Sequence, residues 1–255
     1  MIWTENDDYG SEMLIVNGGL PRSGTVLVGT MICEILRIQG YLWQRYNPQE
    51  RRHLPQFADR VRSWPSGQTA LLVHTHVADQ AVLNLLAGRR DAAVFWNHRD
   101  PRDVAVSLRK LHDMPLDRAI IAVQVYAGIE QVVMQSGLAV RLRYEDIIKD
   151  PADLVGKIAA ALDADLSPGR IAEIVEKTSI DRHRKIMRKL ADGGDGARTL
   201  TTINRPLRED PDTLINDRHI QSGTSGRWRQ ELSPEEQQMV DDALRPFAKA
   251  LGYQT

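Results

Sequence analysis

The stretch of chain that most constrains the fold is residues 13–36. A continuous apolar run over residues 13–16 leads into the segment GGLPRSGT at residues 18–25. A helical pattern follows at once, with apolar side chains at Leu27, Val28, Met31, Ile32, Ile35 and Leu36. A buried strand, a glycine-bracketed turn and an amphipathic helix together present backbone N–H groups and a helix N-terminus to a phosphate. The stretch therefore predicts an anion-binding loop in an α/β domain.

The cation of this loop lies in an unusual place for a loop that binds nucleoside triphosphates. A Walker A loop has a lysine between its last glycine and the Ser/Thr that follows. Here Thr25 follows Gly24 directly, and the cation is Arg22, inside the loop. We therefore expect Arg22 to make the charged contact with the anion.

Strands and helices are predicted to alternate along the rest of the chain. Short apolar runs predict strands at 69–73 and 91–98, and an alternating apolar pattern predicts a strand at 138–144. Apolar residues at helical spacing predict helices at 79–86, 116–135, 152–162, 168–177 and 234–251, with another starting at 101. This alternation predicts an α/β fold with a central, mostly parallel sheet flanked by helices. The length suits one domain over residues 1–255.

Two segments have weak apolar patterns. Residues 41–67, rich in Arg, Gln and Pro, are expected to form irregular or short-helical surface. Residues 180–217 contain a basic, helix-like piece, the glycine-rich DGGDG at 192–196 and two prolines. We expect this second segment to be a mobile flap over the acceptor site.

Composition and charge exclude several classes of protein. Lys and Arg number 33 against 34 for Asp and Glu, so no overall positive field predicts nucleic-acid binding. A single cysteine, Cys33, excludes a disulfide within the chain and favours a reducing compartment. The acidic start of the chain has no apolar core of a signal peptide, and no run approaches the ~18 apolar residues of a membrane span. We expect a soluble, cytoplasmic protein.

Polar residues follow the predicted strands where an α/β sheet binds its ligands. His74 and His76 follow the strand that starts at residue 69, and Arg99 follows the strand that ends at residue 98. The carboxyl ends of parallel strands lie on one side of a sheet, so these side chains are expected to converge with the loop around Arg22 on one ligand.

Five segments resemble motifs of the sulfotransferases that use 3′-phosphoadenosine 5′-phosphosulfate (PAPS). In chain order they are PRSGT at 21–25, VHTH at 73–76, RDPRDVAVS at 99–107, RYEDI at 143–147 and GTSGRWR at 223–229. The resemblance implies a P-loop-NTPase-like sulfotransferase fold, PAPS as co-substrate and adenosine 3′,5′-bisphosphate as product, with no metal. It implies that the 5′-phosphosulfate contacts the loop residues Arg22, Ser23, Gly24, Thr25 and Val26, the 3′-phosphate contacts Arg99 and Ser107, and the remaining nucleotide contacts are Tyr144, Ser222 and Gly223.

The resemblance also suggests how the transfer is catalysed. Arg22 would stabilise charge on the leaving group, and His76, which matches the histidine of the family's Lys-Thr-His, would be the general base. His74 and Glu50 compete with His76 for this role. Arg99 has an alternative as well, because Asp103 follows four residues later and Arg99 could be its structural partner.

The chain departs from the family pattern at two places. His74 stands where cytosolic members have lysine, and Gln221 and Ser222 stand where they have an Arg-Lys pair. The missing anion contact is either weakened or moved, with Arg227 and Arg229 as the candidates.

The predicted reaction is in-line transfer of SO₃ from PAPS to a hydroxyl or an amine. The alternatives are a P-loop small-molecule kinase, which needs a loop lysine that is absent here, and a nucleotide-binding protein without catalysis. The acceptor is expected to be a small molecule or a carbohydrate. The sequence leaves its identity and the oligomeric state open.

Overall fold

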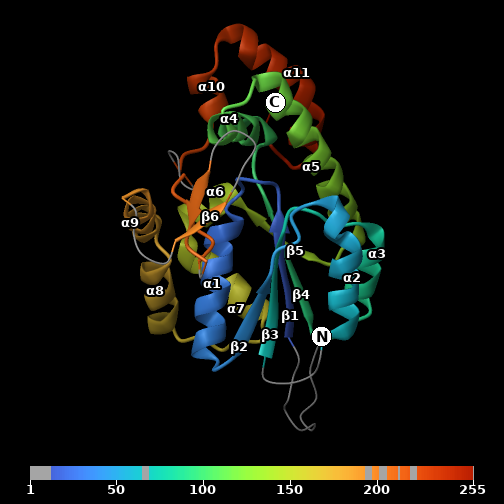
Figure 1. Ribbon diagram of the computed structural model, residues 1–255, viewed down its shortest axis with the longest axis vertical. Coiled ribbons are helices and arrows are strands. Elements are labelled where there is room, and N and C mark those ends of the chain that lie inside the picture. Colours follow the sequence, from blue (N-terminus) through green and yellow to red (C-terminus); the bar gives the residue numbers. More distant parts are fainter. Residues whose placement is uncertain are drawn as a thin grey trace.

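The computed structural model describes residues 13–64, 69–192, 197–200, 206–211, 213–218 and 223–254. At its centre is a five-stranded sheet in the order β2-β3-β1-β4-β5, in which every neighbouring pair is parallel (Figure 1). The strands are β1 (Met13–Gly19), β2 (Leu42–Tyr46), β3 (Thr69–Thr75), β4 (Ala92–His98) and β5 (Ala139–Arg143). The predicted α/β architecture is confirmed.

Helices cover both faces of the sheet, as expected for parallel strands. One face packs against α1 (Thr25–Ile38), α7 (Pro151–Ala161) and α8 (Pro168–Lys177), and the other against α2 (Leu54–Ser63) and α3 (Gln80–Ala87). A further group packs together at the end of the molecule drawn uppermost in Figure 1: α4 (Pro101–His112), α5 (Leu116–Ser136), α10 (Arg227–Glu231) and α11 (Pro234–Ala250). No helix in these described segments is long and apolar enough to cross a bilayer.

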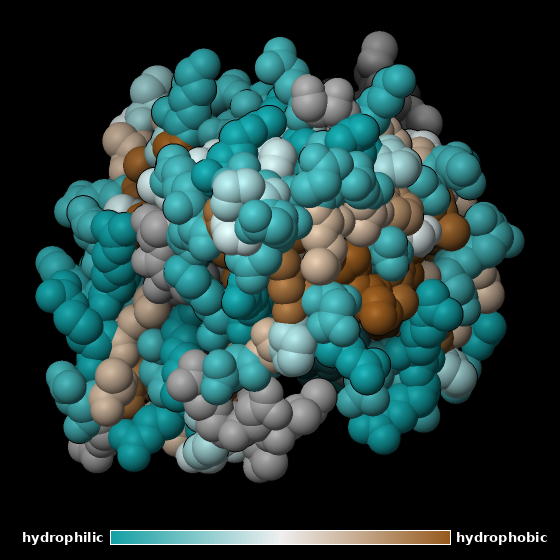
Figure 2. Space-filling view, turned by 90° about the horizontal axis from the view of Figure 1, so that it is seen from above, coloured by the Kyte–Doolittle hydropathy of each residue, from teal (hydrophilic) through white to brown (hydrophobic). Residues whose placement is uncertain are grey.

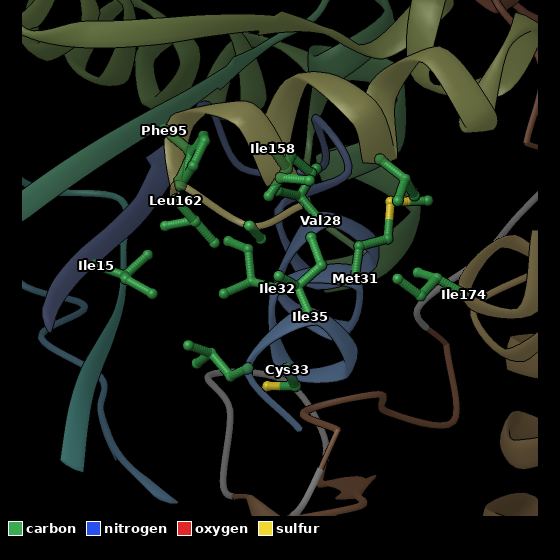
Figure 3. Packing of buried hydrophobic residues seen from close by; sticks show 14 of the residues in the cluster. Ile15, Val28, Met31, Ile32, Cys33, Ile35, Phe95, Ile158, Leu162 and Ile174 are labelled. Atoms are coloured by element: carbon green, nitrogen blue, oxygen red, sulfur yellow. The ribbon is translucent and has the colours of Figure 1, made fainter. Parts of the chain in front are cut away.

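The two faces of the sheet are separated by the alternation of side chains along the strands. On β1, Ile15 packs into the cluster with α1 and α7, whereas Leu14 and Val16 pack into the cluster with α2 and α3. Figure 3 shows the first cluster, in which Ile32 and Ile158 come from α1 and α7. The helical spacing of apolar residues after the loop is therefore explained by burial of one face of α1.

The predicted helix boundaries are reproduced where a capping residue marks them. Asp79 accepts a hydrogen bond from Val82 N at the start of α3, and Asp100 accepts one from Arg102 N at the start of α4. Gly137 adopts the left-handed conformation at the end of α5. These ends are specified locally, by short-range hydrogen bonds and backbone freedom.

The expectation of irregular or short-helical surface for residues 41–67 is wrong for residues 42–46 and agrees with the short helices found in the rest of the described part. Residues 42–46 form β2, the edge strand of the sheet, and α2 follows a short 3₁₀ turn, η1 (Arg51–His53). An edge strand is half covered, so β2 carries polar residues and an exposed Leu42 instead of an apolar run. The α2 helix buries only Phe57, Ala58 and Val61, which is too short a stripe to stand out in the sequence.

The segment predicted to be a flap contains regular structure in its described parts. Residues 180–191 form α9 (Ile180–Ala191), and β6 (Arg198–Leu200) pairs antiparallel with β7 (Leu207–Glu209). Val26 of α1 packs with Leu190, Leu214 and Ile215 of this segment. Residues 193–196, 201–205 and 212 lie outside the described residues. That the segment moves stays a prediction.

The loop after β1 requires glycine at its first bend. Gly19 has a φ of +145°, and a Cβ placed on it would lie 2.0 Å from the carbonyl oxygen of Asn97 on β4. Backbone atoms cannot move aside as a flexible side chain can. Gly19 therefore lets β1 and β4 approach closely where the loop begins.

We expect Gly19→Ala to lower the free energy of unfolding by about 2 kcal/mol, the scale of overpacking in a filled core. Gly128→Ala on α5 is the matched control, because its Cβ would meet nothing within 4 Å. Alanine is also the better helix former, by about 1 kcal/mol. Urea unfolding of both variants measures the difference, and similar stabilities would contradict the close-contact argument.

Candidate active site

The loop between β1 and α1 is held in an unusual backbone conformation. Arg22 has a φ of +68° and Gly24 a φ of +91°, and α1 begins at Thr25. The buried Ser23 turns its hydroxyl inward, 2.5 Å from Leu20 O and 3.0 Å from Asn97 O. A non-glycine residue with positive φ persists only where its surroundings fix it, and such residues gather at binding sites.

Two buried asparagines fix the loop to the sheet. The side-chain amide of Asn17 donates to Thr25 O at 2.7 Å, and the amide of Asn97 donates to Asn17 Oδ1 at 2.9 Å and to Gly18 O at 2.8 Å. Both side chains are fully buried. The sequence analysis did not identify this pair, although asparagine inside two otherwise apolar strands was a usable signal.

A pocket at the carboxyl end of the sheet brings most of the predicted cofactor residues together. It is lined by Arg22, Gly24, Leu27, Arg99, Ser107, Tyr144, Ile148, Ile180, His183, Gly223 and Arg227. Of the predicted residues, Ser23, Thr25 and Val26 belong to the same loop and helix start but do not line it. Ser222 lies outside the described residues.

The two predicted anion sites adjoin within this pocket. Arg22 Nε donates to Ser107 Oγ at 3.0 Å, which joins the residue expected at the 5′-phosphosulfate to one expected at the 3′-phosphate. The Arg22 guanidinium also lies 3.5 Å from Arg218 O. The pKa of Arg22 is lowered to about 10, first by burial and then by the nearby charge of Arg99. Arg22 is still a cation at neutral pH.

Arg99 is the structural partner of Asp103 and also lines the pocket. It forms an ion pair with Asp103, at 3.3 Å, and donates to Thr224 O at 2.7 Å and Arg22 O at 3.3 Å. Its guanidinium carbon lies 4.1 Å from the centroid of the Tyr144 ring. Arg99 therefore links the early loop to the late loop and still lines the pocket.

Asp103 connects the pocket to the late glycine-rich segment. Its carboxylate is fully buried and accepts hydrogen bonds from Gly226 N at 2.8 Å and Trp228 N at 3.1 Å, besides the Arg99 ion pair. The sequence offered Asp103 only as a possible partner of Arg99. Its two backbone partners, Gly226 and Trp228, lie more than 120 residues away, so no local pattern identifies them.

A second cavity, of about 290 Å³, adjoins the charged pocket. The two share Leu27, Ile148, Ile180 and Gly223. The walls of the second cavity are mostly apolar and come from α1, α6 (Tyr144–Lys149), α8 and the start of α9: Leu27, Met31, Ile147, Ile148, Pro151, Val175, Thr178, Ser179, Ile180, Asp181, Arg184 and Gly223. Seen from above, this end of the molecule is mostly hydrophilic, with its largest apolar area to the right of the centre (Figure 2).

His76 lies beside the loop and not in the charged pocket. Its Nδ1 is 2.8 Å from Gly19 O. A carbonyl oxygen only accepts, so Nδ1 carries the proton and Nε2 keeps a lone pair. Burial lowers the pKa of His76 to about 4, so the ring is neutral at pH 7.

The two competing bases have different surroundings. His74 is buried, its pKa is lowered to about 3 by burial, and its ring centroid lies 5.5 Å from that of His76. Glu50 caps η1, where it accepts from the His53 backbone and pairs with Arg52 at 2.9 Å. Because Glu50 is engaged in this cap, the histidines are favoured over it as the general base.

Four pocket residues, Leu27, Ile148, Ile180 and His183, were not predicted as site residues. His183, on α9, is 3% exposed, and its Nε2 lies 3.4 Å from Thr30 Oγ1 on α1. Burial lowers its pKa to about 4. The residues of α9 were expected in a flap over the acceptor site, whereas Ile180 and His183 line the same pocket as the predicted cofactor residues.

Comparison with known proteins agrees with this geometry. Residues 135–252 match the model of the sulfotransferase domain family. Over this part of its length the chain is similar to sulfotransferase domains. The expected resemblance is confirmed in sequence over those residues and in fold over nearly the whole chain. A search of curated proteins found no match. In the described segments no group of three or more His, Cys, Asp or Glu side chains is arranged to hold a metal ion.

Solved structures share the fold at low sequence identity. Mouse sulfotransferase SULT7A1 complexed with PAP has a TM-score of 0.66 at 16% identity, with 95% of this chain and 86% of that chain covered. Retinol dehydratase in complex with retinol and PAP has a TM-score of 0.60 at 16% identity, with 98% and 84% covered. The sulfotransferase domain of the Synechococcus PCC 7002 olefin synthase has a TM-score of 0.52 at 14% identity, with 100% of both chains covered. The sulfotransferase fold of the chain is thereby established.

The buried histidines of the protein predict loss of stability in acid. The unfolded chain takes up a proton on His183 below about pH 6.5, whereas the folded protein does so only near pH 4. The contribution of the neutral His183 to the free energy of unfolding is therefore fully present above pH 6.5 and is lost as the pH falls towards 4. We expect His183→Leu to make the slope of unfolding free energy shallower, by up to about 1.4 kcal/mol per pH unit between these values. Urea titrations from pH 7 to 4 measure the free energy of unfolding of both proteins. Equal slopes of this free energy against pH would contradict the prediction.

Proposed function

We propose that the protein transfers the sulfuryl group of PAPS to a hydroxyl or amine acceptor and releases adenosine 3′,5′-bisphosphate. The observation that carries this proposal is the convergence of Arg22, Arg99 and Ser107 in one buried pocket beside an apolar cavity. PAPS combines anionic groups at both ends of its ribose with a planar base. The chain offers cations for the anionic groups and apolar walls for the base.

The electrostatics of the pocket fit an anionic ligand. Arg22 is buried close to Arg99, and their mutual repulsion lowers the pKa of Arg22. A bound phosphate relieves this repulsion and gains charge-assisted hydrogen bonds from both guanidinium groups. The start of α1 at Thr25 adds backbone N–H donors and the positive end of a helix dipole. Tyr144, stacked on Arg99, would lie against the nucleotide.

PAPS supplies the sulfuryl group and a good leaving group. The residues of the chain therefore need only position the two substrates, neutralise the charge on the leaving group and accept a proton from the acceptor. Arg22 would balance the charge that develops on the leaving phosphate oxygen, a role for which fixed cations are worth several kcal/mol. His76 would accept the proton of the acceptor at Nε2 as the new bond to sulfur forms. Its Nδ1–H bond to Gly19 O holds the ring in the required tautomer. The Gly19 carbonyl thus couples the base to the loop.

The acceptor proposed is a small molecule or a carbohydrate. Aromatic residues make up only 5% of the chain, which argues against a wide aromatic pocket for phenols or steroids. One structural neighbour is retinol dehydratase in complex with androsterone, a steroid, so the fold itself does not exclude such ligands. We expect no nucleic-acid partner, because the net charge is -1.

Calorimetry with three nucleotides tests the proposed co-substrate. We expect adenosine 3′,5′-bisphosphate to bind more tightly than ADP or ATP, and Mg²⁺ to leave its affinity unchanged. The reason is that Arg99 and Ser107 would contact a 3′-phosphate that ADP and ATP lack. Tighter, Mg²⁺-dependent binding of ATP would indicate a kinase. Transfer from labelled PAPS to a panel of acceptors then separates an enzyme from a nucleotide-binding protein without catalysis.

His76→Ala tests the general base. We expect turnover to fall by ~100- to 10,000-fold with PAPS affinity unchanged, the usual contribution of a positioned base. Because the pKa of His76 is about 4, kcat/KM of the unmodified protein should be flat from pH 7 to 5 and fall as the pH approaches 4. His74→Ala is the control for loss of a neighbouring imidazole. If His76→Ala turns over within ~10-fold of the unmodified protein, the base is another group.

A further inference from the structure

We propose that Arg227 is a third cation of the cofactor site and contacts the 3′-phosphate. This inference rests on the proposed function. Arg227 begins α10, is 3% exposed and lines the same pocket as Arg99 and Ser107. Its charge is close enough to Arg22 to contribute to the lowered pKa of that residue. The sequence left Arg227 and Arg229 as equal candidates for the displaced anion contact.

The structure separates these two arginines. Arg229 is exposed, and its guanidinium carbon lies 4.2 Å from the centroid of the Trp228 ring, away from the residues that line the pocket. Arg102 occupies another position against the same ring, at 4.5 Å. Arg229 therefore packs on Trp228, and Arg227 is the member of the pair that faces the cofactor site.

Glu231 holds the Arg227 guanidinium in a fixed plane. Arg227 Nε donates to Glu231 Oε1 at 2.7 Å and Nη2 donates to Oε2 at 3.2 Å, across one turn of α10. The same carboxylate pairs with Lys110 of α4, whose Nζ lies 2.5 Å from Oε2. One carboxylate shared by two cations leaves the region positive. Glu231 thus orients Arg227 without cancelling its charge, which is what a preorganised anion contact needs.

The position of Arg227 in the late loop assigns it to the 3′ end of the nucleotide. The segment just before it is tied to Arg99 through Thr224 O, at 2.7 Å, and to Asp103 through Gly226 N, at 2.8 Å. Arg99 and Ser107 are the residues expected at the 3′-phosphate. A phosphate monoester carries nearly two negative charges at neutral pH. A second guanidinium beside Arg99 matches that charge, in a chain with no Arg-Lys pair at positions 221–222.

Binding of two nucleotides to three variants tests this assignment. The probes are adenosine 3′,5′-bisphosphate and adenosine 5′-phosphate, which differ only in the 3′-phosphate. We expect Arg227→Met to weaken bisphosphate binding at least ~10-fold and to change adenosine 5′-phosphate binding less than ~3-fold, as for loss of one charge-assisted hydrogen bond. Arg229→Met, the matched control on the same helix, should leave both affinities within ~3-fold. Arg227→Lys keeps the charge without the planar guanidinium, so its bisphosphate affinity should lie between those of the unmodified protein and Arg227→Met.

Each outcome decides the assignment. Equal bisphosphate affinities for Arg227→Met and Arg229→Met would overturn it. Equal losses for both nucleotides in Arg227→Met would overturn it too, because the contact would then be to the shared 5′ end. If Arg227→Met does not fold, the assignment is overturned when Arg227→Lys binds the bisphosphate as tightly as the unmodified protein does. Failure of the unmodified protein to prefer the bisphosphate would reject the proposed function itself, a result distinct from loss of the Arg227 effect alone.

Discussion

The buried carboxylate of Asp103 is the interaction on which the pocket depends. It lies in the first turn of α4, pairs with Arg99 and accepts hydrogen bonds from the backbone N–H groups of Gly226 and Trp228. A buried charge without partners costs several kcal/mol, so these three partners are required together. Asp103 thereby joins Arg99, which follows β4, to the late segment that leads into Arg227. Without Asp103, Arg99 and this segment would lose their shared partner.

The cations around this carboxylate have two different purposes. Arg102 is 1% exposed and is fully engaged with Asp100, Asp241 and the carbonyl of Gln254, so it ties α4 to α11 and the end of the chain. Arg22, Arg99 and Arg227 lie against one pocket with fewer carboxylates than cations. Repulsion within this second group is a cost to folding that an anionic ligand can offset. The distribution of carboxylates thus distinguishes the fully paired Arg102 from the arginines that we propose bind the nucleotide.

The sequence alone determined four of the five strands of the sheet, the loop and most of the pocket. Continuous apolar runs specify buried parallel strands, and Pro, Gly and Asp at helix ends specify boundaries, because both depend on neighbouring residues. Arg22, Arg99 and Ser107 were found because each lies in a compact motif at the end of a strand or in the helix after it. The edge strand β2 was missed because a half-covered strand has no apolar run to reveal it.

Only the tertiary structure decided which charges meet. The Arg22–Ser107 hydrogen bond spans 85 residues and the Arg99–Thr224 bond spans 125, so neither leaves a local pattern. The choice between Arg227 and Arg229 depends on which way two neighbouring side chains of one short helix face. The neutral state of His76 depends on burial beside the Gly19 carbonyl. Residue types fix which chemistry is available, whereas burial and long-range contacts fix which of those residues can perform it.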